Sequence, residues 1–153
     1  MHANVEVLVV DDSDNDAALT LDSLRSAAPD VSVRRLNSGE RALHFLCATD
    51  EFAGRPGGLP KLVVLDLDMP GMDGIAVLQA LRARADMQQV SVVLWTSNSN
   101  PLSIERALQS GASAYRVKPS SLDAYRGEID LIVQRWLHDG AITISAAAAK
   151  RSA

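Results

Sequence analysis

The sequence feature that most constrains the fold is a short apolar run that ends in a carboxylate. Residues 62–65 read Leu-Val-Val-Leu and are followed directly by Asp66. An unbroken β-branched run of this length is typical of a strand buried on both faces of a parallel sheet. Turn chemistry explains Pro70, Gly71 and Gly74, which follow. It does not explain Asp66, because a charge at the end of a buried strand needs a partner or a function.

Four further stretches have the character of strands, and helical periodicity lies between them. The expected strands are residues 6–10, 31–36, 62–65, 90–95 and 114–117. Strands that alternate with helices form a parallel sheet covered on both faces. With right-handed crossovers, this order predicts an α/β flavodoxin-like fold, a doubly wound (βα)₅ three-layer sandwich with sheet order 2-1-3-4-5.

The helices are expected to begin near residues 14, 38, 75, 102 and 122, and the last should extend to about residue 138. Apolar residues at helical spacing identify their inward faces. In the first helix these are Ala18, Leu21, Leu24 and Ala28, and in the last helix Leu122, Tyr125, Ile129, Ile132 and Trp136. The last helix carries more apolar residues than one covering face requires, namely Leu131, Val133 and Leu137.

The length of 153 residues fits one domain, expected at residues 1–145 with its core at 5–138. The Ala-rich residues 146–153 are expected to form a disordered tail. A net charge of −4 argues against a nucleic-acid-binding surface. The single cysteine, Cys47, fits a reducing compartment and a buried structural role. Without a signal-peptide pattern or a run long enough to span a bilayer, the sequence predicts a cytoplasmic protein with no membrane contact.

Polar side chains that follow four of the strands are expected to meet at one edge of the sheet. They are Asp11, Asp12, Asp66, Thr96 and Lys118. Several carboxylates close together repel one another, and a hard divalent cation such as Mg²⁺ or Mn²⁺ relieves that repulsion. A lysine and a hydroxyl suit the oxygens of a phosphoryl group. An aspartate beside Mg²⁺ can then form an aspartyl-phosphate.

Taken together, these residues resemble the receiver domain of response regulators in bacterial two-component signalling, over about residues 5–138. The matching marks are Asp11-Asp12, Asp66-Leu67-Asp68-Met69-Pro70-Gly71-Met72-Asp73-Gly74, Thr96-Ser97 and Lys118-Pro119. Their joint spacing and order are far more specific than any one of them. The resemblance implies that Asp66 accepts a phosphoryl group from a histidine kinase in a phosphorelay, as a signalling phosphoacceptor and not as an enzyme.

The same resemblance implies roles for the surrounding residues. Asp12 and Asp66 would ligate Mg²⁺ together with the backbone carbonyl of Asp68, and Asp11 would act through water. Thr96 and Lys118 would hold phosphoryl oxygens, and the bond from Lys118 to its proline would be cis. Asp68 stands where many receivers have asparagine.

A conformational switch is expected to follow phosphorylation. Thr96 can move toward the phosphoryl oxygens and vacate space for Tyr115, which would change the face formed by the fourth helix, fifth strand and fifth helix. The apolar end of the last helix is similar to that of single-domain regulators paired with bacterial phytochrome-type kinases. Such regulators commonly form homodimers through that face.

Two other functions remain open from the sequence. Mg²⁺-dependent phosphohydrolases also use an aspartate nucleophile, although theirs typically follows the first strand and is accompanied by cap insertions that this chain lacks. A degenerate receiver would bind partners without phosphorylation. The five polar residues at the sheet edge argue against the degenerate form.

Overall fold

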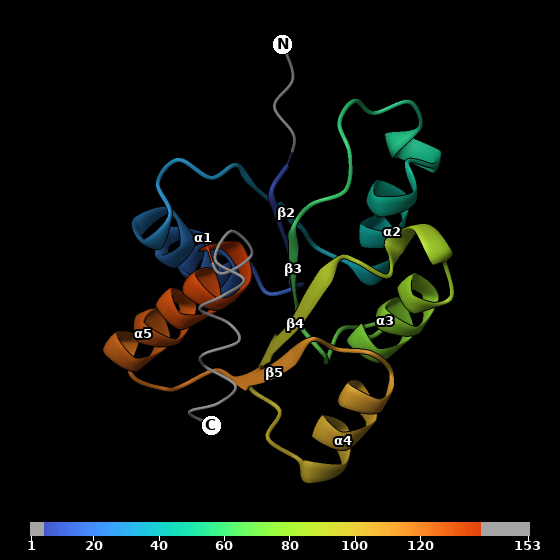
Figure 1. Ribbon diagram of the computed structural model, residues 1–153. Coiled ribbons are helices and arrows are strands. Elements are labelled where there is room, and N and C mark those ends of the chain that lie inside the picture. The colour runs from blue at the N-terminus through green and yellow to red at the C-terminus, as the bar shows by residue number, and fades with distance from the viewer. Residues whose placement is uncertain (1–4, 139–153) are drawn as a thin grey trace.

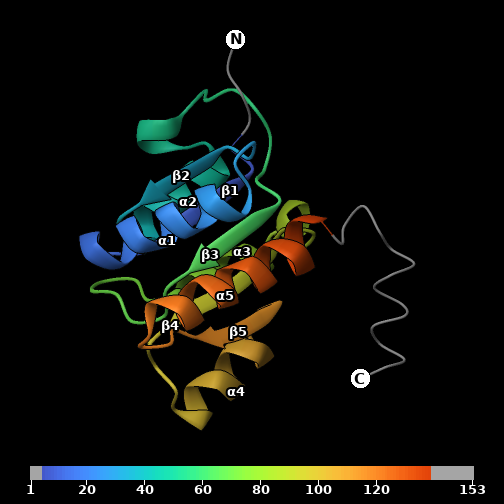
Figure 2. The ribbon, with the colours of Figure 1, turned by 90° about the vertical axis from the view of Figure 1, so that its left-hand side faces the viewer.

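The computed structural model describes residues 5–138, which form one parallel sheet between two layers of helices (Figures 1 and 2). The sheet has five strands in the order β2-β1-β3-β4-β5, which confirms the predicted topology. The strands are β1 (Val7–Val10), β2 (Val33–Leu36), β3 (Leu62–Leu65), β4 (Ser91–Thr96) and β5 (Ala114–Val117). The tail expected at residues 146–153 lies outside the described residues.

Helices α1 and α5 cover one face of the sheet, and α2, α3 and α4 cover the other (Figures 1 and 2). The helices are α1 (Asp14–Ala27), α2 (Gly39–Cys47), α3 (Gly74–Arg82), α4 (Pro101–Gln109) and α5 (Leu122–Val133). A π-helical turn, Gln134–His138, continues α5, and short 3₁₀ turns occur at Asp50–Phe52 and Ala85–Met87. Within residues 5–138, every helix falls short of the length and apolar content that a bilayer crossing requires.

The central strands are buried on both faces, as their unbroken apolar runs predict. In β1, Leu8 and Val10 enter the core beneath α2 and α3, while Val7 and Val9 enter the core beneath α1 and α5. Strand β2 lies at the edge of the sheet, and its residue Arg34 is exposed. Two separate apolar layers therefore hold the sheet in place.

Short polar residues begin each of the five α-helices and so fix where the loops leave the sheet. The N-cap side chains that accept a backbone N–H are Ser13, Ser38, Asp73, Asn100 and Ser121. Gly74, the first residue of α3, passes so close to β3 that a Cβ there would lie 2.5 Å from the carbonyl oxygen of Asp66. The turn after Asp66 therefore requires a glycine at this position.

The predicted inward face of α1 is wrong in part. Ala18 is exposed, whereas Ala17, Thr20 and Ser23 are buried. Hydropathy alone favoured Ala18, but the hydroxyl of Thr20 has buried hydrogen-bond partners that remove the cost of its burial.

Four further local expectations differ from the structure. Leu122, predicted to face inward, is half exposed, and Val133, predicted to be surplus, belongs to the core. Cys47 is half-buried against the core rather than fully buried. Every peptide bond in the described residues is trans, so the expected cis bond between Lys118 and Pro119 is absent. The two isomers of an X–Pro bond differ by only about 0.5–1 kcal/mol, so tertiary context selects between them.

Candidate functional site

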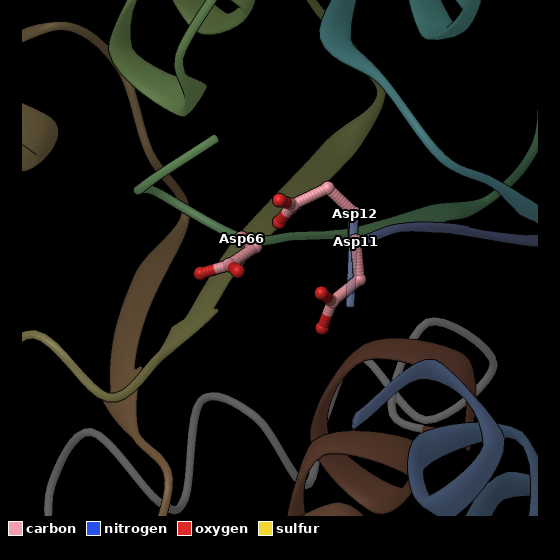
Figure 3. A group of neighbouring side chains, drawn as sticks. All are labelled: Asp11, Asp12 and Asp66. Carbon is pink, nitrogen blue, oxygen red and sulfur yellow. The ribbon is translucent and has the colours of Figure 1, made fainter. Parts of the chain in front are cut away.

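Three carboxylates converge at the carboxyl ends of β1 and β3 (Figure 3). Oxygen atoms of Asp11, Asp12 and Asp66 all lie within 4.8 Å of one another. The pairing of Val10 with Leu65 in adjacent strands aligns the residues that follow them. Asp11 and Asp66 are buried and Asp12 is exposed, so the acidic cluster lies at the surface on one side.

The carboxyl group of Asp66 is poised between neutral and charged forms. Its pKa is raised to about 6, chiefly by burial; Lys118 and a hydrogen bond with Thr96 oppose the increase, and the neighbouring Asp11 adds to it. The backbone N–H of Leu67 also donates to Asp66 Oδ1, at 2.8 Å. The negative charge of ionised Asp66 is therefore only partly compensated by Lys118, Thr96 and Leu67, and a bound cation would compensate it further.

The acidic cluster fits a hard divalent cation. All its ligand atoms are carboxylate oxygens, the type that Mg²⁺ and Mn²⁺ prefer, and no sulfur or imidazole lies among them. The exposed position of Asp12 leaves room for the water ligands that Mg²⁺ usually keeps.

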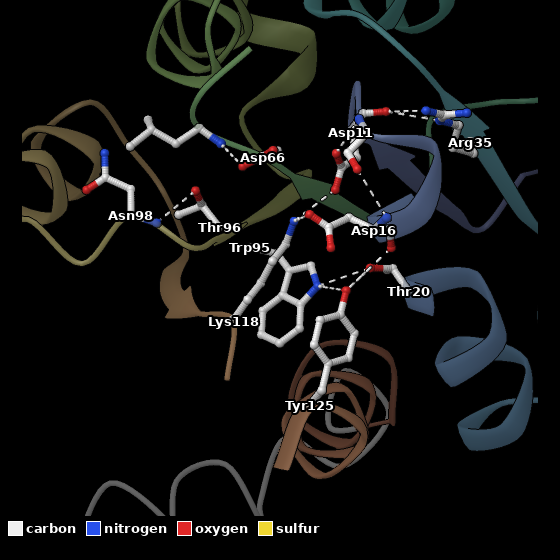
Figure 4. Close-up of polar contacts among 12 residues, drawn as sticks. Asp11, Asp16, Thr20, Arg35, Asp66, Trp95, Thr96, Asn98, Lys118 and Tyr125 are labelled. Atoms are coloured by element: carbon white, nitrogen blue, oxygen red, sulfur yellow. Dashed lines mark hydrogen bonds and ion pairs between the residues drawn. The ribbon is translucent and has the colours of Figure 1, made fainter. Parts of the chain in front are cut away.

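Lys118 extends from the end of β5 across the sheet edge to the acidic cluster (Figure 4). Its Nζ donates to Asp11 Oδ2 at 2.9 Å and lies 3.4 Å from Asp16 Oδ2. Burial by itself would lower the pKa of Lys118, but the hydrogen bond with Asp11 and the attraction of Asp66, Asp11 and Asp16 raise it above its ordinary value. The lysine is therefore charged at neutral pH.

Thr96, the last residue of β4, is buried beside Asp66. A hydrogen bond with Thr96 favours the charged form of Asp66, and the Thr96 hydroxyl oxygen also accepts the N–H of Asn98, at 3.3 Å. The hydroxyl of Thr96 thus lies next to Asp66, at the carboxyl end of its strand.

Asp68 and Tyr115 are linked through Asn98, in the loop between β4 and α4. The Asp68 carboxylate is exposed, outside the acidic cluster, and accepts a hydrogen bond from Asn98 Nδ2 at 3.1 Å. Tyr115 is half-buried, and its hydroxyl donates to the carbonyl oxygen of Asn98 at 2.6 Å. Any inward rotation of Tyr115 has to break this hydrogen bond.

Sequence reasoning missed Arg35, which braces the acidic cluster from the edge strand β2. Its Nε and Nη2 donate to the backbone carbonyl of Asp11 at 3.0 and 2.8 Å (Figure 4). Its Nη1 pairs with Asp14 at 2.9 Å. The sequence did offer one indication, because Arg35 lies near the carboxyl end of β2 and β2 was expected to be the neighbour of β1.

A buried polar triangle lies on the face of the sheet that α1 and α5 cover, between β4 and these two helices (Figure 4). The Thr20 hydroxyl lies 2.6 Å from the Tyr125 hydroxyl, and the indole N–H of Trp95 lies 3.1 Å from Thr20 and 3.2 Å from Tyr125. The Tyr125 hydroxyl also reaches the backbone carbonyl of Asp16, at 3.4 Å. This triangle joins the residue before Thr96 to the helix that carries Asp16.

Comparison with known proteins gives one family. The model of the response regulator receiver domain matches residues 7–130. Rcp1, a response regulator of Synechocystis sp., is 28% identical over 141 residues, which cover 92% of this chain and 93% of the relative. FilR2 of Methanothrix harundinacea, described as a probable methanogenesis regulatory protein, is 28% identical over 131 residues, covering 86% of this chain and 83% of the relative.

Solved structures of similar proteins have the same fold. The Mn²⁺-bound form of the response regulator Rcp1 matches with a TM-score of 0.78 and 27% identity, over 86% of this chain and 93% of that one. The response regulator RPA3017, in red light signaling of R. palustris, matches with a TM-score of 0.78 and 29% identity, over 86% and 92% of the two chains.

Proposed function

The chain belongs to the response regulator receiver domain family, and we propose that Asp66 accepts a phosphoryl group from a histidine kinase. The observation that carries the proposal is the position of Asp66, which lies within 4.8 Å of two other carboxylates at a sheet edge that also holds Thr96 and a charged lysine. Receiver domains are signalling phosphoacceptors, so the readout of this chain is protein contact and not product release.

Asp12 and Asp66 would hold Mg²⁺ directly, with the backbone carbonyl of Asp68, and Asp11 would act through water; Mn²⁺ could take the same place. When bound, the ion supplies positive charge that offsets the carboxylates and the transferring phosphoryl oxygens. The Asp68 carboxylate has a different role, because it holds Asn98.

The transfer itself is a displacement at phosphorus. A carboxylate oxygen of Asp66 attacks the phosphorus of a phosphohistidine, and the new P–O bond forms as the P–N bond breaks. The electron pair of the broken bond stays on the imidazole, which takes up a proton. Lys118 and the Thr96 hydroxyl would stabilise the phosphoryl oxygens, since both already interact with Asp66.

The proposed switch couples Thr96 to Tyr115. When Thr96 turns toward the phosphoryl oxygens, its hydroxyl oxygen no longer accepts the hydrogen bond from the N–H of Asn98. The hydrogen bond from the Tyr115 hydroxyl to the carbonyl oxygen of Asn98 can then break as well. Both contacts belong to one loop, so a change at the phosphoryl group would alter the α4–β5–α5 face.

We also propose that this face forms a homodimer. The large apolar side chains that are most exposed within residues 5–138 all belong to its three elements, at Leu102 and Leu108 of α4, Val117 of β5, and Leu122 and Leu131 of α5. Likeness to RPA3017, which is described as a response regulator in red light signaling, supports a red-light-sensing histidine kinase of the phytochrome type as the partner. The free thiol at Cys47 suits the cytoplasm as the setting.

Labelling with acetyl phosphate in the presence of Mg²⁺ tests the phosphoacceptor. We expect up to one phosphoryl group per chain in the wild type, and none in Asp66→Asn or after addition of EDTA. The matched control is Asp130→Asn, an exposed carboxylate of α5, which should label as the wild type does. Labelling of Asp66→Asn at the wild-type level would refute the proposal.

The same reaction separates the phosphoacceptor from a phosphohydrolase. A receiver domain should form its aspartyl-phosphate without multiple turnover of small phosphate esters. Sustained hydrolysis of p-nitrophenyl phosphate that disappears in Asp66→Asn would favour the hydrolase instead.

A further inference from the structure

We propose that Asp16 is a positioning residue that competes with Asp66 for the ammonium of Lys118 in the resting protein and so limits the rate at which Asp66 gains a phosphoryl group. The inference rests on the proposed function, in which Lys118 stabilises the phosphoryl oxygens. It assigns a role to a carboxylate outside the acidic cluster.

The contacts of Lys118 show two carboxylates competing with Asp66 for its charge. Its Nζ lies 2.9 Å from Asp11 Oδ2 and 3.4 Å from Asp16 Oδ2, and these are its ion pairs within residues 5–138. The Lys118 side chain is 4% exposed and that of Asp16 is 43% exposed. Asp16 therefore contacts the buried ammonium from the solvent side.

Asp16 is held in place by contacts that do not involve its carboxylate. Its N–H donates to Ser13 Oγ at 3.2 Å, and its carbonyl oxygen is 3.4 Å from the hydroxyl of Tyr125. That hydroxyl belongs to the buried triangle with Thr20 and Trp95. The backbone of Asp16 thus has a fixed position, from which the side chain can hold or release the lysine.

Phosphorylation of Asp66 requires Lys118 to exchange partners. The ammonium must leave Asp16 before it can contact the new phosphoryl oxygens fully, while Asp11 can stay within reach from its place beside Asp66. A partly exposed ion pair changes an equilibrium by at most about fivefold. Neutralising Asp16 should therefore speed phosphorylation by about two- to fivefold.

The kinetic test is a double-mutant cycle with acetyl phosphate and Mg²⁺. We expect Asp16→Asn to label about two- to fivefold faster than the wild type, and Asp16→Glu, which keeps the charge, to label at close to the wild-type rate. In the Lys118→Met background, the Asn substitution should have no effect on the remaining rate, because its action passes through the lysine. Asp123→Asn, an exposed carboxylate of α5, is the matched control for a loss of negative charge.

A second measurement follows the resting contact without metal or phosphoryl donor. In ¹H–¹⁵N correlation spectra of the metal-free protein, the Lys118 ammonium signal should shift in Asp16→Asn and remain unchanged in Asp123→Asn. Equal labelling rates for wild type and Asp16→Asn, an increase that persists in the Lys118→Met background, or an unchanged ammonium signal would each overturn the inference. Absence of labelling in the wild type would instead overturn the proposed function, and the kinetic role of Asp16 with it.

Discussion

Asp66 combines burial with a charge that its neighbours do not fully compensate, and this has a cost in the metal-free protein. Burial raises its pKa from 3.8 to about 6, so the folded state favours the neutral acid. An acid with a raised pKa leaves stability unaffected below its unfolded pKa and lowers it as the pH rises through the folded value. The loss of folding stability caused by the buried charge of Asp66 should therefore be present above pH 6 and nearly absent around pH 4.

We predict that Asp66→Asn stabilises the metal-free protein by about 1–2 kcal/mol at pH 8, after discounting the shift for partial solvent screening. The gain should fall toward zero near pH 4, where Asp66 is protonated in the wild type. Urea unfolding in EDTA at the two pH values measures it. Equal stabilities at pH 8 would show that Lys118 and Thr96 compensate the charge completely.

A single residue also decides the path of the chain between β3 and α3. A Cβ at Gly74 would lie 2.5 Å from the Asp66 carbonyl oxygen and 2.9 Å from the Cα of Leu67, and both atoms belong to the backbone. We predict that Gly74→Ala costs about 1–3 kcal/mol in unfolding free energy, because the start of α3 must move. The same shift should slow labelling of Asp66.

Gly127→Ala is the internal comparison for that substitution. Gly127 lies in the middle of α5, and a Cβ there would meet nothing within 4 Å. Alanine at this helical position should stabilise the protein by about 0.5–1 kcal/mol. Similar effects of the two substitutions on urea unfolding would contradict the close approach at Gly74.

At the scale of helices and strands, the apolar pattern predicted the sheet because the marks of its central strands are local in the sequence. The runs at β1 and β3 are buried on both faces, and their order fixes the crossovers. The inner face of α1 was not predictable in full. Thr20 and Ser23 are polar, and Thr20 is buried because Trp95 and Tyr125, more than 70 residues away, bond its hydroxyl.

The candidate site was predictable where its residues directly follow strands, since sheet order then brings them together. Asp11, Asp12, Asp66 and Lys118 belong to this class, and Thr96 is the last residue of its strand. Asp16 was not predictable in the same way, because its contact depends on the direction of a helix turn and on where the lysine side chain ends. The one indication in the sequence was that Asp16 lies in the first helical turn after the pair Asp11-Asp12.

For the molecule as a whole, Mg²⁺ binding should be linked to folding. A ligand that binds only the folded state stabilises it by mass action, and saturating Mg²⁺ should add about 1–3 kcal/mol. Urea unfolding with Mg²⁺ and with EDTA measures the difference. Most of it should be lost in Asp66→Asn, and a gain that is the same in both proteins would place the ion elsewhere.

The α4–β5–α5 face yields a prediction about assembly. Phosphorylation with acetyl phosphate and Mg²⁺ should move the wild type toward the dimer mass in light-scattering measurements. Leu131→Glu, on the exposed face of α5, should weaken the dimer at least tenfold without unfolding the chain, because the side chain is 51% exposed. Ala18→Glu, on the exposed face of α1, is the control and should assemble as the wild type does. A dimer that is unaffected by Leu131→Glu would exclude this face.

The place of Trp95 gives the protein an optical probe of its own. The indole precedes Thr96 and is held by Thr20 and Tyr125, while the sequence has only one other tryptophan, Trp136. With Trp136 replaced by phenylalanine, ultraviolet emission comes from one indole next to the reacting edge of the sheet. Its intensity and wavelength can then follow the modification of a single aspartate in real time, with no dye attached.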